Sequence, residues 1–591
     1  MPELINYEEN LTKLRKLMRD LNLKSYIIFN SDPHNSEEPN PYYSSLRNQF
    51  SPYHAPAGTM LVTLDESYIY TDGRFWIAAE KALKGSNTKL QKAGKKDVLP
   101  MEEFIKLNKL TPLGIDESLV PYSYIETLSG YHLEFVNLSI SDLFTKEDKT
   151  ETKKIFKLDD SLLSTTFEKR IVEVRNYLKS NNYDAIIISA LDEVAHILGY
   201  RGFDINYAPV FYSYLFISND EIHLFIDKNK LPEPFSLNDK LIVHDYNDVF
   251  SYLKNSNLKI AFDKNSANLK IVNSIKNKVG VFSPVCISKA IKGEVEIKNI
   301  LKYHINDGLY VLKLMKYIDD NKDKELSEYD YACYLDNLRL SDKDCFELSF
   351  ETIASVDANA TMMHYAPTST CFSKVKKDNK LLLVDSGGQY YGATTDITRT
   401  FLISEPTSEI KHDYTLTLKS QIALTTSIFM DRSSGHTLDI KAREVMWKEG
   451  LDYKCGTGHG VGYMLNVHEG PIGFRYYIRP GVFDMGVLLP GHVITVEPGV
   501  YKENKYGIRL ENELLVRKHS TTDQGIFYCF ETITYCPYDR RLIDASMLND
   551  SELEWLNSYH QLVYDKLYPL TKDDKELLAY LKYHTSRISK W

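Results

Sequence analysis

Short apolar runs separated by polar turns organise the first half of the chain. A helix-like spacing of apolar positions over residues 11–23 leads into an apolar run at 24–29. About thirty residues later, two apolar runs flank a polar turn within residues 58–74, which is the pattern of a β-hairpin. The pattern therefore predicts a helix, a buried strand, a spacer and a hairpin, in that order.

The same order recurs further along the chain. A helix-like spacing at 169–179 precedes the apolar run 184–189, and a second hairpin pattern covers 212–227. Because a repeated order of elements predicts a repeated structural unit, we expect two α/β domains of like fold. Their predicted extents are residues 1–157 and 158–290.

The pattern changes after this second unit. A long helix-like spacing covers residues 294–322, and a run of charged residues at 319–325 predicts a solvated connection. Further helices follow, and then alternating strands and turns. We therefore expect a third domain over residues 291–591.

Composition and charge narrow the class of protein. The 591 residues carry a net charge of −10, without clusters of basic and aromatic residues, which argues against a nucleic-acid partner. No apolar run reaches the roughly 20 residues of a membrane span, so we expect no membrane partner. The acidic start of the chain and seven cysteines without metal or redox spacing favour a cytoplasmic location.

Five residues of the last third combine into a candidate metal site. They lie at the ends of apolar runs or between glycines: Asp385, Asp396, His459, Glu497 and Glu511. Carboxylates can bridge two hard cations, and a single imidazole adds one nitrogen ligand. This set favours a pair of Mn²⁺-like divalent ions over a thiolate zinc site.

One aspartate after an apolar run is most often a turn residue. The ordered set of five, each in its own flanking segment, resembles the metallopeptidases of pita-bread fold. That family includes methionine aminopeptidase, prolidase, Xaa-Pro aminopeptidase and the metal-free creatinase. All five ligand positions of the family are filled in this sequence, whereas binding proteins of this fold that have lost catalysis would lack some of them.

The resemblance extends over the whole chain. Residues 72–76, 190–195 and 201–202 are similar to the creatinase-type domains of the large three-domain Xaa-Pro aminopeptidases of eukaryotes, and 554–560 to their C-terminal tail. The resemblance implies an α/β (α+β) architecture of two creatinase-like domains and a C-terminal pita-bread catalytic domain. It also implies a homodimer.

The resemblance assigns roles to the five candidate ligands. Asp385 would chelate one ion, Asp396 and Glu511 would bridge both, and His459 and Glu497 would complete the site. Glu497 would also act as the general base. Two such ions can hold a hydroxide between them as the nucleophile. We expect Mn²⁺, with Zn²⁺ or Co²⁺ as alternatives.

Further residues match substrate-binding or supporting positions of the family. The resemblance implies that His364 and His468 bind the scissile carbonyl or deliver a proton to the leaving nitrogen. Arg509 is expected to orient a ligand carboxylate, and Tyr501 to line the pocket. Arg399 is expected either to orient a ligand as well or to form an ordinary surface ion pair.

Two segments depart from the family pattern. Residues 50–58 contain two prolines where the family usually has a glycine-rich loop. Residues 355–361 lack the glycines that the family commonly has there. We therefore expect the loop that carries His364 to be stiffer or differently shaped.

The resemblance implies an aminopeptidase that hydrolyses the bond between an N-terminal residue and a following proline. Its substrates would be peptides with proline at the second position. A prolidase-type dipeptidase is the alternative enzyme, although prolidases usually have one N-terminal domain. A catalytically silent interaction protein of this fold is the alternative from another class.

Overall fold

The structure is a computed structural model, and it describes residues 5–37, 39, 41–141, 153–235, 237, 241–477 and 486–590. This part of the chain forms two compact units. The first contains residues 5–158 and 165–286, and the second contains residues 159–164, 287–477 and 486–590. The division of the chain into three domains stays a prediction, and each unit is described by itself.

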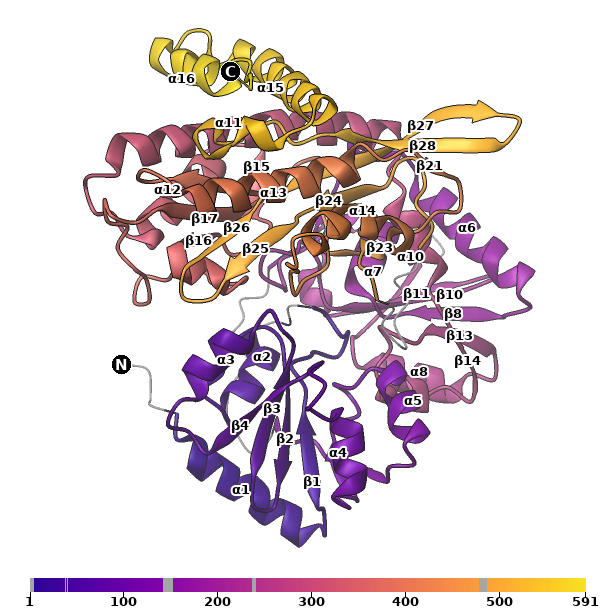
Figure 1. Ribbon diagram of the computed structural model, residues 1–591. Coiled ribbons are helices and arrows are strands. Elements are labelled where there is room, and N and C mark those ends of the chain that lie inside the picture. The colour runs from indigo at the N-terminus through magenta and orange to yellow at the C-terminus, as the bar shows by residue number, and fades with distance from the viewer. Residues whose placement is uncertain are drawn as a thin grey trace. The chain divides into compact units, whose positions relative to one another are not determined.

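The first unit contains two six-stranded sheets (Figure 1). The strands of the first sheet lie in the order β4 (Thr88–Lys92), β3 (Ser67–Thr71), β2 (Thr59–Thr63), β1 (Ser25–Ile28), β5 (Leu113–Ile115) and β6 (Phe135–Asn137). β1–β2 and β2–β3 are antiparallel pairs, whereas β1–β5, β3–β4 and β5–β6 are parallel. The predicted hairpin is therefore β2–β3.

Helices cover both faces of this sheet. They are α1 (Tyr7–Asp20), α2 (Pro41–Asn48), α3 (Trp76–Leu83), α4 (Met101–Leu107) and α5 (Tyr122–Gly130). Successive side chains of a strand point to opposite faces. Accordingly Tyr26 and Ile28 of β1 share a core cluster with α1 and α3, whereas Ile27 packs with α4 and α5.

The second sheet repeats this arrangement strand for strand. Its strands lie in the order β12 (Leu241–His244), β11 (Ile222–Ile226), β10 (Ser213–Ser218), β8 (Ala185–Ile188), β13 (Lys259–Asp263) and β14 (Asn277–Val281). β8–β10 and β10–β11 are antiparallel, and β11–β12, β8–β13 and β13–β14 are parallel. The predicted pair of α/β units of like fold is confirmed.

The second sheet has its own helices, and a small sheet of two strands accompanies them. These elements are α6 (Phe167–Ser180), α7 (Leu191–Leu198), α8 (Asp248–Asn255), α9 (Leu269–Asn273), β7 (Phe156–Lys157) and β9 (Tyr200–Arg201). The side chains of α8 and α9 pack on the face of the sheet that carries Ile187 and Phe216. The next helix, α10 (Pro284–Ala290), contains the boundary between the two units.

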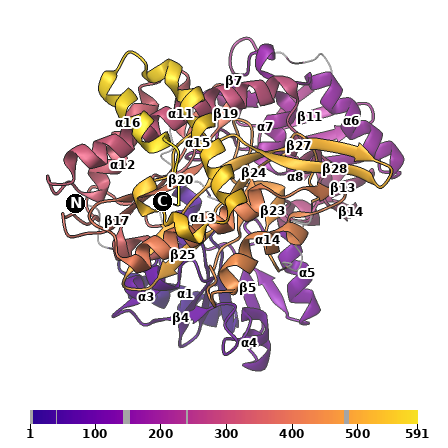
Figure 2. The ribbon, with the colours of Figure 1, turned by 45° about the horizontal axis from the view of Figure 1, so that its top comes forward.

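The second unit contains the long helix that the pattern predicted. Its α-helices after α10 are α11 (Glu294–Asn321), α12 (Glu328–Leu340), α13 (Ser408–Thr425), α14 (Gly435–Trp447), α15 (Asp550–Thr571) and α16 (Lys575–Thr585). Its short 3₁₀-helices are η2 (Asp160–Leu162), η4 (Asp357–Thr361), η5 (Arg540–Leu542) and η6 (Ala545–Met547). No helix formed by the described residues is long and apolar enough to cross a membrane. In both views of the molecule, α15 and α16 lie beside α11 (Figure 2).

The described strands of the second unit form four sheets. Two sheets have three strands each: β15 (Cys345–Leu348), β18 (Gly388–Tyr390) and β19 (Ala393–Thr394) form one, and β16 (Ile353–Val356), β17 (Leu381–Ser386) and β20 (Ile397–Leu402) form the other. The six-stranded sheet has the order β21 (Phe429–Met430), β28 (Gly525–Thr532), β27 (Asn512–Thr522), β24 (Val493–Val496), β22 (Gly458–Gly460) and β23 (Glu469–Phe474), and β25 (Gly499–Lys502) pairs with β26 (Tyr506–Arg509) in the fourth. The pairs that these strands form in the described chain are antiparallel.

The charged run at 319–325 is not simply a solvated connection. Asp319 lies in the last turn of α11, where Arg541 Nη1 is 2.8 Å from its carboxylate. The hydroxyl of Tyr580 in α16 donates to the same carboxylate at 2.6 Å. The end of α11 is therefore fastened to the C-terminal part of the chain by charge as well as by apolar packing.

Candidate metal centre

The five predicted ligands are placed by five different strand segments of the second unit. Asp385 is in β17, and Asp396 stands immediately before β20. His459 is the central residue of β22. Glu497 directly follows β24, and Glu511 connects β26 to β27. Because antiparallel partners bring distant chain segments together, residues far apart in the sequence reach one place.

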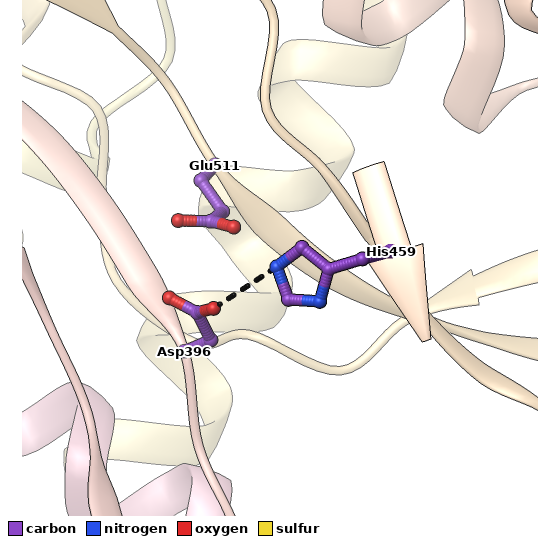
Figure 3. Close-up of side chains that lie close together, drawn as sticks. All are labelled: Asp396, His459 and Glu511. Carbon is purple, nitrogen blue, oxygen red and sulfur yellow. Dashed lines mark ion pairs between the residues drawn. The ribbon is translucent and has the colours of Figure 1, made fainter. Parts of the chain in front are cut away.

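Three of the five form a compact cluster. One ligand atom each from Asp396, His459 and Glu511 lies within 4.8 Å of the others, and Figure 3 shows the three side chains facing one another. His459 Nε2 is 3.4 Å from Asp396 Oδ2 and 3.7 Å from Glu497 Oε1. His459 Nδ1 is bonded to the Gly460 carbonyl at 2.9 Å, so Nε2 is the nitrogen that faces the carboxylates.

Glycines on both sides of His459 allow its strand to approach its neighbours. A Cβ atom on Gly458 would lie 1.9 Å from the Thr495 carbonyl oxygen of β24. A Cβ atom on Gly460 would lie 2.3 Å from the carbonyl oxygen of Glu469 in β23. Any larger residue would push β22 away from both strands, so the Gly-His-Gly pattern is required by this close packing.

Asp385 is held by a buried arginine. Arg509 Nη2 is 2.5 Å from Asp385 Oδ2, while Nε donates to Thr398 Oγ1 at 3.1 Å. Its Nη1 donates to the hydroxyl of Tyr501 at 2.9 Å. The planar guanidinium thus fixes one oxygen of Asp385 and leaves the other oxygen available to bind a metal ion.

The electrostatics of the cluster favour added positive charge. Burial raises the pKa of Glu511 well above its ordinary value, and the charges of Asp396 and Asp385 raise it further. Burial also raises the pKa of Asp396 well above its ordinary value, with Asp385 and Glu513 adding to the effect. The pKa of Glu497 is raised, chiefly by burial. Buried carboxylates this close to one another need protons or cations.

The donor set fits divalent metal ions. Among the described residues neither Asp385 Oδ1 nor Asp396 Oδ1 has a hydrogen-bond partner, although both atoms are buried. Oxygen atoms of this kind, together with one imidazole nitrogen, are suitable ligands for Mn²⁺, Zn²⁺ or Co²⁺. The part played by each of the five residues stays a prediction.

The two predicted substrate-binding histidines lie in different surroundings. The ring of His468 is 4.2 Å from the ring of His459 and perpendicular to it, at 89°. His364 is exposed, and the carbonyl of the preceding residue, Met363, accepts from Arg509 Nη2 at 3.4 Å. His468 therefore lies beside the cluster, whereas the His364 loop is linked to it through the Met363 carbonyl and Arg509, and the roles of both histidines stay predictions.

A further carboxylate beneath the cluster was not anticipated. Glu513 Oε1 accepts from the backbone N–H of Asp396 at 2.7 Å, and its Oε2 is 3.1 Å from His304 Nε2. Burial lowers the pKa of His304, but the charge and hydrogen bond of Glu513, the Ile300 carbonyl and the charge of Asp307 together raise it above its ordinary value. The sequence did contain one signal for Glu513: it follows Glu511 by two positions, and residues at i and i+2 lie on one face of a strand.

Of the two roles expected of Arg399, the surface ion pair is wrong, and the orientation of a metal ligand stays a prediction. It is buried, and its Nη1 donates to the backbone carbonyl of Glu511 at 2.6 Å. Its Nη2 donates to Asn512 Oδ1 at 2.8 Å and to the Cys536 carbonyl at 2.8 Å. Arg399 therefore fixes the backbone around Glu511 and is not a surface ion pair.

Comparisons with known families agree with this arrangement. Residues 305–518 match the family described as metallopeptidase family M24, and 526–588 match the C-terminal region of that family. Residues 146–296 match the creatinase/prolidase N-terminal domain. The three matches together extend from the second sheet of the first unit to the C-terminal helices.

Curated relatives match over nearly the whole chain. A probable Xaa-Pro aminopeptidase P of Laccaria bicolor is 34% identical over 99% of this chain and 94% of its own length. Xaa-Pro aminopeptidase 1 of Dictyostelium discoideum is also 34% identical, over 95% of this chain and 93% of its own.

Solved structures give the same architecture. The X-prolyl aminopeptidase of Caenorhabditis elegans, described as a cytosolic enzyme with a di-nuclear active site, has a TM-score of 0.92 at 29% identity. The match covers 99% of this chain and all of that one. An Xaa-Pro dipeptidase from Bacillus anthracis matches at a TM-score of 0.50 and 19% identity, over 63% of this chain and 99% of its own, which bears on the fold alone.

Proposed function

Because this chain belongs to the Xaa-Pro aminopeptidases of metallopeptidase family M24, we propose that it removes the N-terminal residue from peptides whose second residue is proline. The observation that carries this proposal is the 34% identity to such enzymes over 99% of the chain. The prolidase alternative has less support, because the dipeptidase structure has no counterpart to about a third of this chain.

The carboxylates of Asp385, Asp396, Glu497 and Glu511, with His459 Nε2, are the atoms that would hold two divalent ions. A bound pair would lower the pKa of a water molecule and polarise the scissile carbonyl. We propose Mn²⁺ as the native metal, since four carboxylates and one imidazole suit such an ion. Zn²⁺ and Co²⁺ are the alternatives.

The chain's own residues supply the proton transfers and the orientation. Glu497 accepts the proton of the attacking water, since its carboxylate lies at the cluster and Oε1 is already within 3.7 Å of His459. His468 lies next to His459, and His364 follows Met363, whose carbonyl is bonded to Arg509. These two histidines bind the scissile carbonyl and deliver a proton to the leaving proline nitrogen. Arg509 and Tyr501 keep Asp385 in position.

Proline gives the substrate its distinguishing chemistry. The bond before proline is a tertiary amide without an N–H, and the ring fixes φ, so peptidases that bind that N–H are poorly suited to it. A site that supplies a proton to the ring nitrogen favours departure of this amine. We infer that short proline-containing peptides are the substrates.

The assembly and location are also part of the proposal. We propose a homodimer in the cytosol, following the architecture that the resemblance implies and the description of the Caenorhabditis elegans relative as cytosolic. Sedimentation velocity of the metal-loaded protein measures the mass of the assembly and so tests the homodimer. A mass near twice 68.2 kDa is expected, and a mass near the single-chain value contradicts it.

The activity is tested by mass spectrometry of peptides incubated with the Mn²⁺-loaded protein. An Arg-Pro-Pro tripeptide and longer peptides with proline second should each lose one N-terminal residue. Cleavage confined to Xaa-Pro dipeptides in parallel reactions would establish the prolidase alternative. Bound metal without any cleavage would favour the silent interaction protein.

A further inference from the structure

We propose that Glu328 is a positioning residue for the substrate, because its buried carboxylate fixes the loop that carries His364. This loop comprises residues 356–373, and we call it the His364 loop. The inference rests on the proposed function only through the role of His364 in binding the substrate. The hold of Glu328 on the loop is independent of that function.

The contacts of Glu328 are almost all with this loop. It is the first residue of α12, and its side chain is fully buried. Oε1 accepts from the backbone N–H of Val356 at 2.7 Å and from Asn359 Nδ2 at 2.9 Å. Oε2 accepts from the Tyr365 hydroxyl at 2.9 Å and from the backbone N–H of Ser373 at 2.7 Å. One carboxylate thus holds both ends of the loop and two points within it.

Backbone contacts strengthen the same attachment. The N–H of Glu328 donates to the Ser373 carbonyl at 2.9 Å, and the N–H of Val375 donates to the Leu326 carbonyl at 2.8 Å. The end of the loop therefore runs alongside the residues that begin α12. Any shift of Glu328 would be transmitted directly to the loop.

The opposite side of the loop packs against the strand that carries Arg509. A Cβ atom on Gly507 of β26 would lie 2.2 Å from the Ala360 carbonyl oxygen, so η4 and β26 are in close contact. Arg509 of the same strand binds the carbonyl of Met363, the residue before His364. The loop is thus held between α12 and β26, and Glu328 provides the α12 side.

A carboxylate is required because all four groups that face it are donors. Two carboxylate oxygens can accept four hydrogen bonds, whereas a glutamine side chain would turn an NH₂ group toward two donors. In a fully buried position that mismatch cannot be relieved by water. The segment 355–361 also lacks glycine, so the loop owes its shape to these contacts and to a stiff backbone.

The test is the variant Glu328→Gln in the full-length, Mn²⁺-loaded protein, with Asp330→Asn as a matched control. Asp330, in the first turn of α12, accepts from the N–H and the hydroxyl of Ser327, the N-cap of that helix, and among the described residues its side chain forms no hydrogen bond with the loop. For E328Q we expect kcat/KM on a proline-containing tripeptide to fall ten- to hundred-fold, with two ions still bound per chain. D330N should stay within about twofold of the parent protein.

A double-mutant cycle separates positioning from general destabilisation. If Glu328 acts through His364, then adding E328Q to His364→Ala should lower kcat/KM by less than about twofold. An undiminished loss in the H364A background would overturn the proposal. Loss of bound metal in E328Q, or an equal loss of activity in D330N, would overturn it as well.

Hydrogen exchange gives a readout that does not require activity. In E328Q, amides of the His364 loop should exchange faster, while those of β22 and β27 keep their parent rates. Unchanged exchange in the loop would contradict the proposal even if the parent protein proved to have no peptidase activity. If E328Q does not fold, Tyr365→Phe takes its place as the test variant. It removes only one of the four donors, so exchange in the His364 loop should become faster by a smaller amount.

Discussion

Arg509 illustrates at the scale of the residue how the candidate metal centre is held. Its guanidinium contacts Asp385, Thr398 and Tyr501 at once, and it also reaches the Met363 carbonyl. These contacts use the planar fork of donors that lysine lacks. One side chain thereby links a predicted ligand, a predicted pocket residue and the His364 loop.

Replacing Arg509 by lysine should therefore weaken the site although the charge is kept. We expect kcat/KM to fall about ten- to hundred-fold and the affinity for Mn²⁺ to fall by a similar factor, as for other residues that orient metal ligands. Isothermal titration with Mn²⁺ and peptide assays measure the two effects. Parental values of both in R509K would show that the fork geometry is unimportant.

The proposed role of Glu497 as the general base is tested by the variant Glu497→Gln. The amide keeps the shape of the side chain but cannot accept the proton, so we expect kcat to fall at least a hundred-fold with the fold preserved. Peptide assays, with circular dichroism to check the fold, measure this. Near-parental turnover would exclude Glu497 as the base.

The candidate ligands could be predicted from the sequence because each lies in a short segment with its own flanking pattern. The i, i+2 spacing indicated that Glu511 and Glu513 share one face of a strand, but the sequence could not reveal the contact of Glu513 with Asp396 or the contacts of Arg399. Those residues act on the backbone of Asp396 and Glu511, which lie more than a hundred positions away along the chain. Contacts of this kind depend on tertiary packing, because the spacing within one segment does not show which distant segment lies against it.

At the scale of the element, pairs of strands that are neighbours in the sequence were predictable, and pairs of strands that are distant in the sequence were not. The hairpins β2–β3 and β10–β11 follow from alternating patterns around a short turn. The parallel strands β5, β6, β13 and β14 pair across long connections, so they were not foreseen. The long helix α11 was foreseen, but the attachment of its end to Arg541 was not.

The C-terminal helices α15 and α16 contain buried neutral histidines. Burial lowers the pKa of His584 from 6.5 to about 4, and the pKa of His560 to about 3. Among the described residues, neither ring nitrogen of His584 has a hydrogen-bond partner. Between pH 6.5 and about 4 the unfolded chain binds protons that the folded chain does not. The stability of the fold should therefore decrease as pH falls through this window.

Substituting His584 by leucine should reduce this acid sensitivity. One histidine with such a shift accounts for up to about 3 kcal/mol of stability lost on acidification. Thermal unfolding of the parent and of H584L at pH 7 and pH 5 measures the difference, with the exposed His519→Leu as control. An equal decrease in Tm for parent and H584L would contradict the assignment.

At the scale of the whole molecule, the metal centre couples catalysis to stability. Its ligands come from several strands of the second unit, and they repel one another when no cation is bound. A ligand that binds only the folded state stabilises it by about 3–4 kcal/mol at a hundred to a thousand times its Kd. The metal should therefore raise the unfolding temperature of this unit.

Removing the metal with a chelator should lower the Tm of one calorimetric transition, and adding Mn²⁺ should restore it. The transition of the first unit should not change, because the candidate ligands all lie in the second. The Asp396→Ala variant is the control, since its Tm should respond little to chelator. A parent protein insensitive to chelator would contradict a metal-dependent fold of this unit.

The packing of α15 and α16 against α11 has a consequence for how the chain is made. Contacts between α11 and the C-terminal part of the second unit complete this unit, since Tyr580 and Arg541 bind the end of α11. At 5–20 residues per second, synthesis from residue 321 to residue 585 takes roughly 13–50 s. The first unit can fold on the ribosome during this interval, whereas the second must wait for its last helix. A nascent chain therefore carries its cluster of carboxylates in an incomplete unit until α16 has been synthesised.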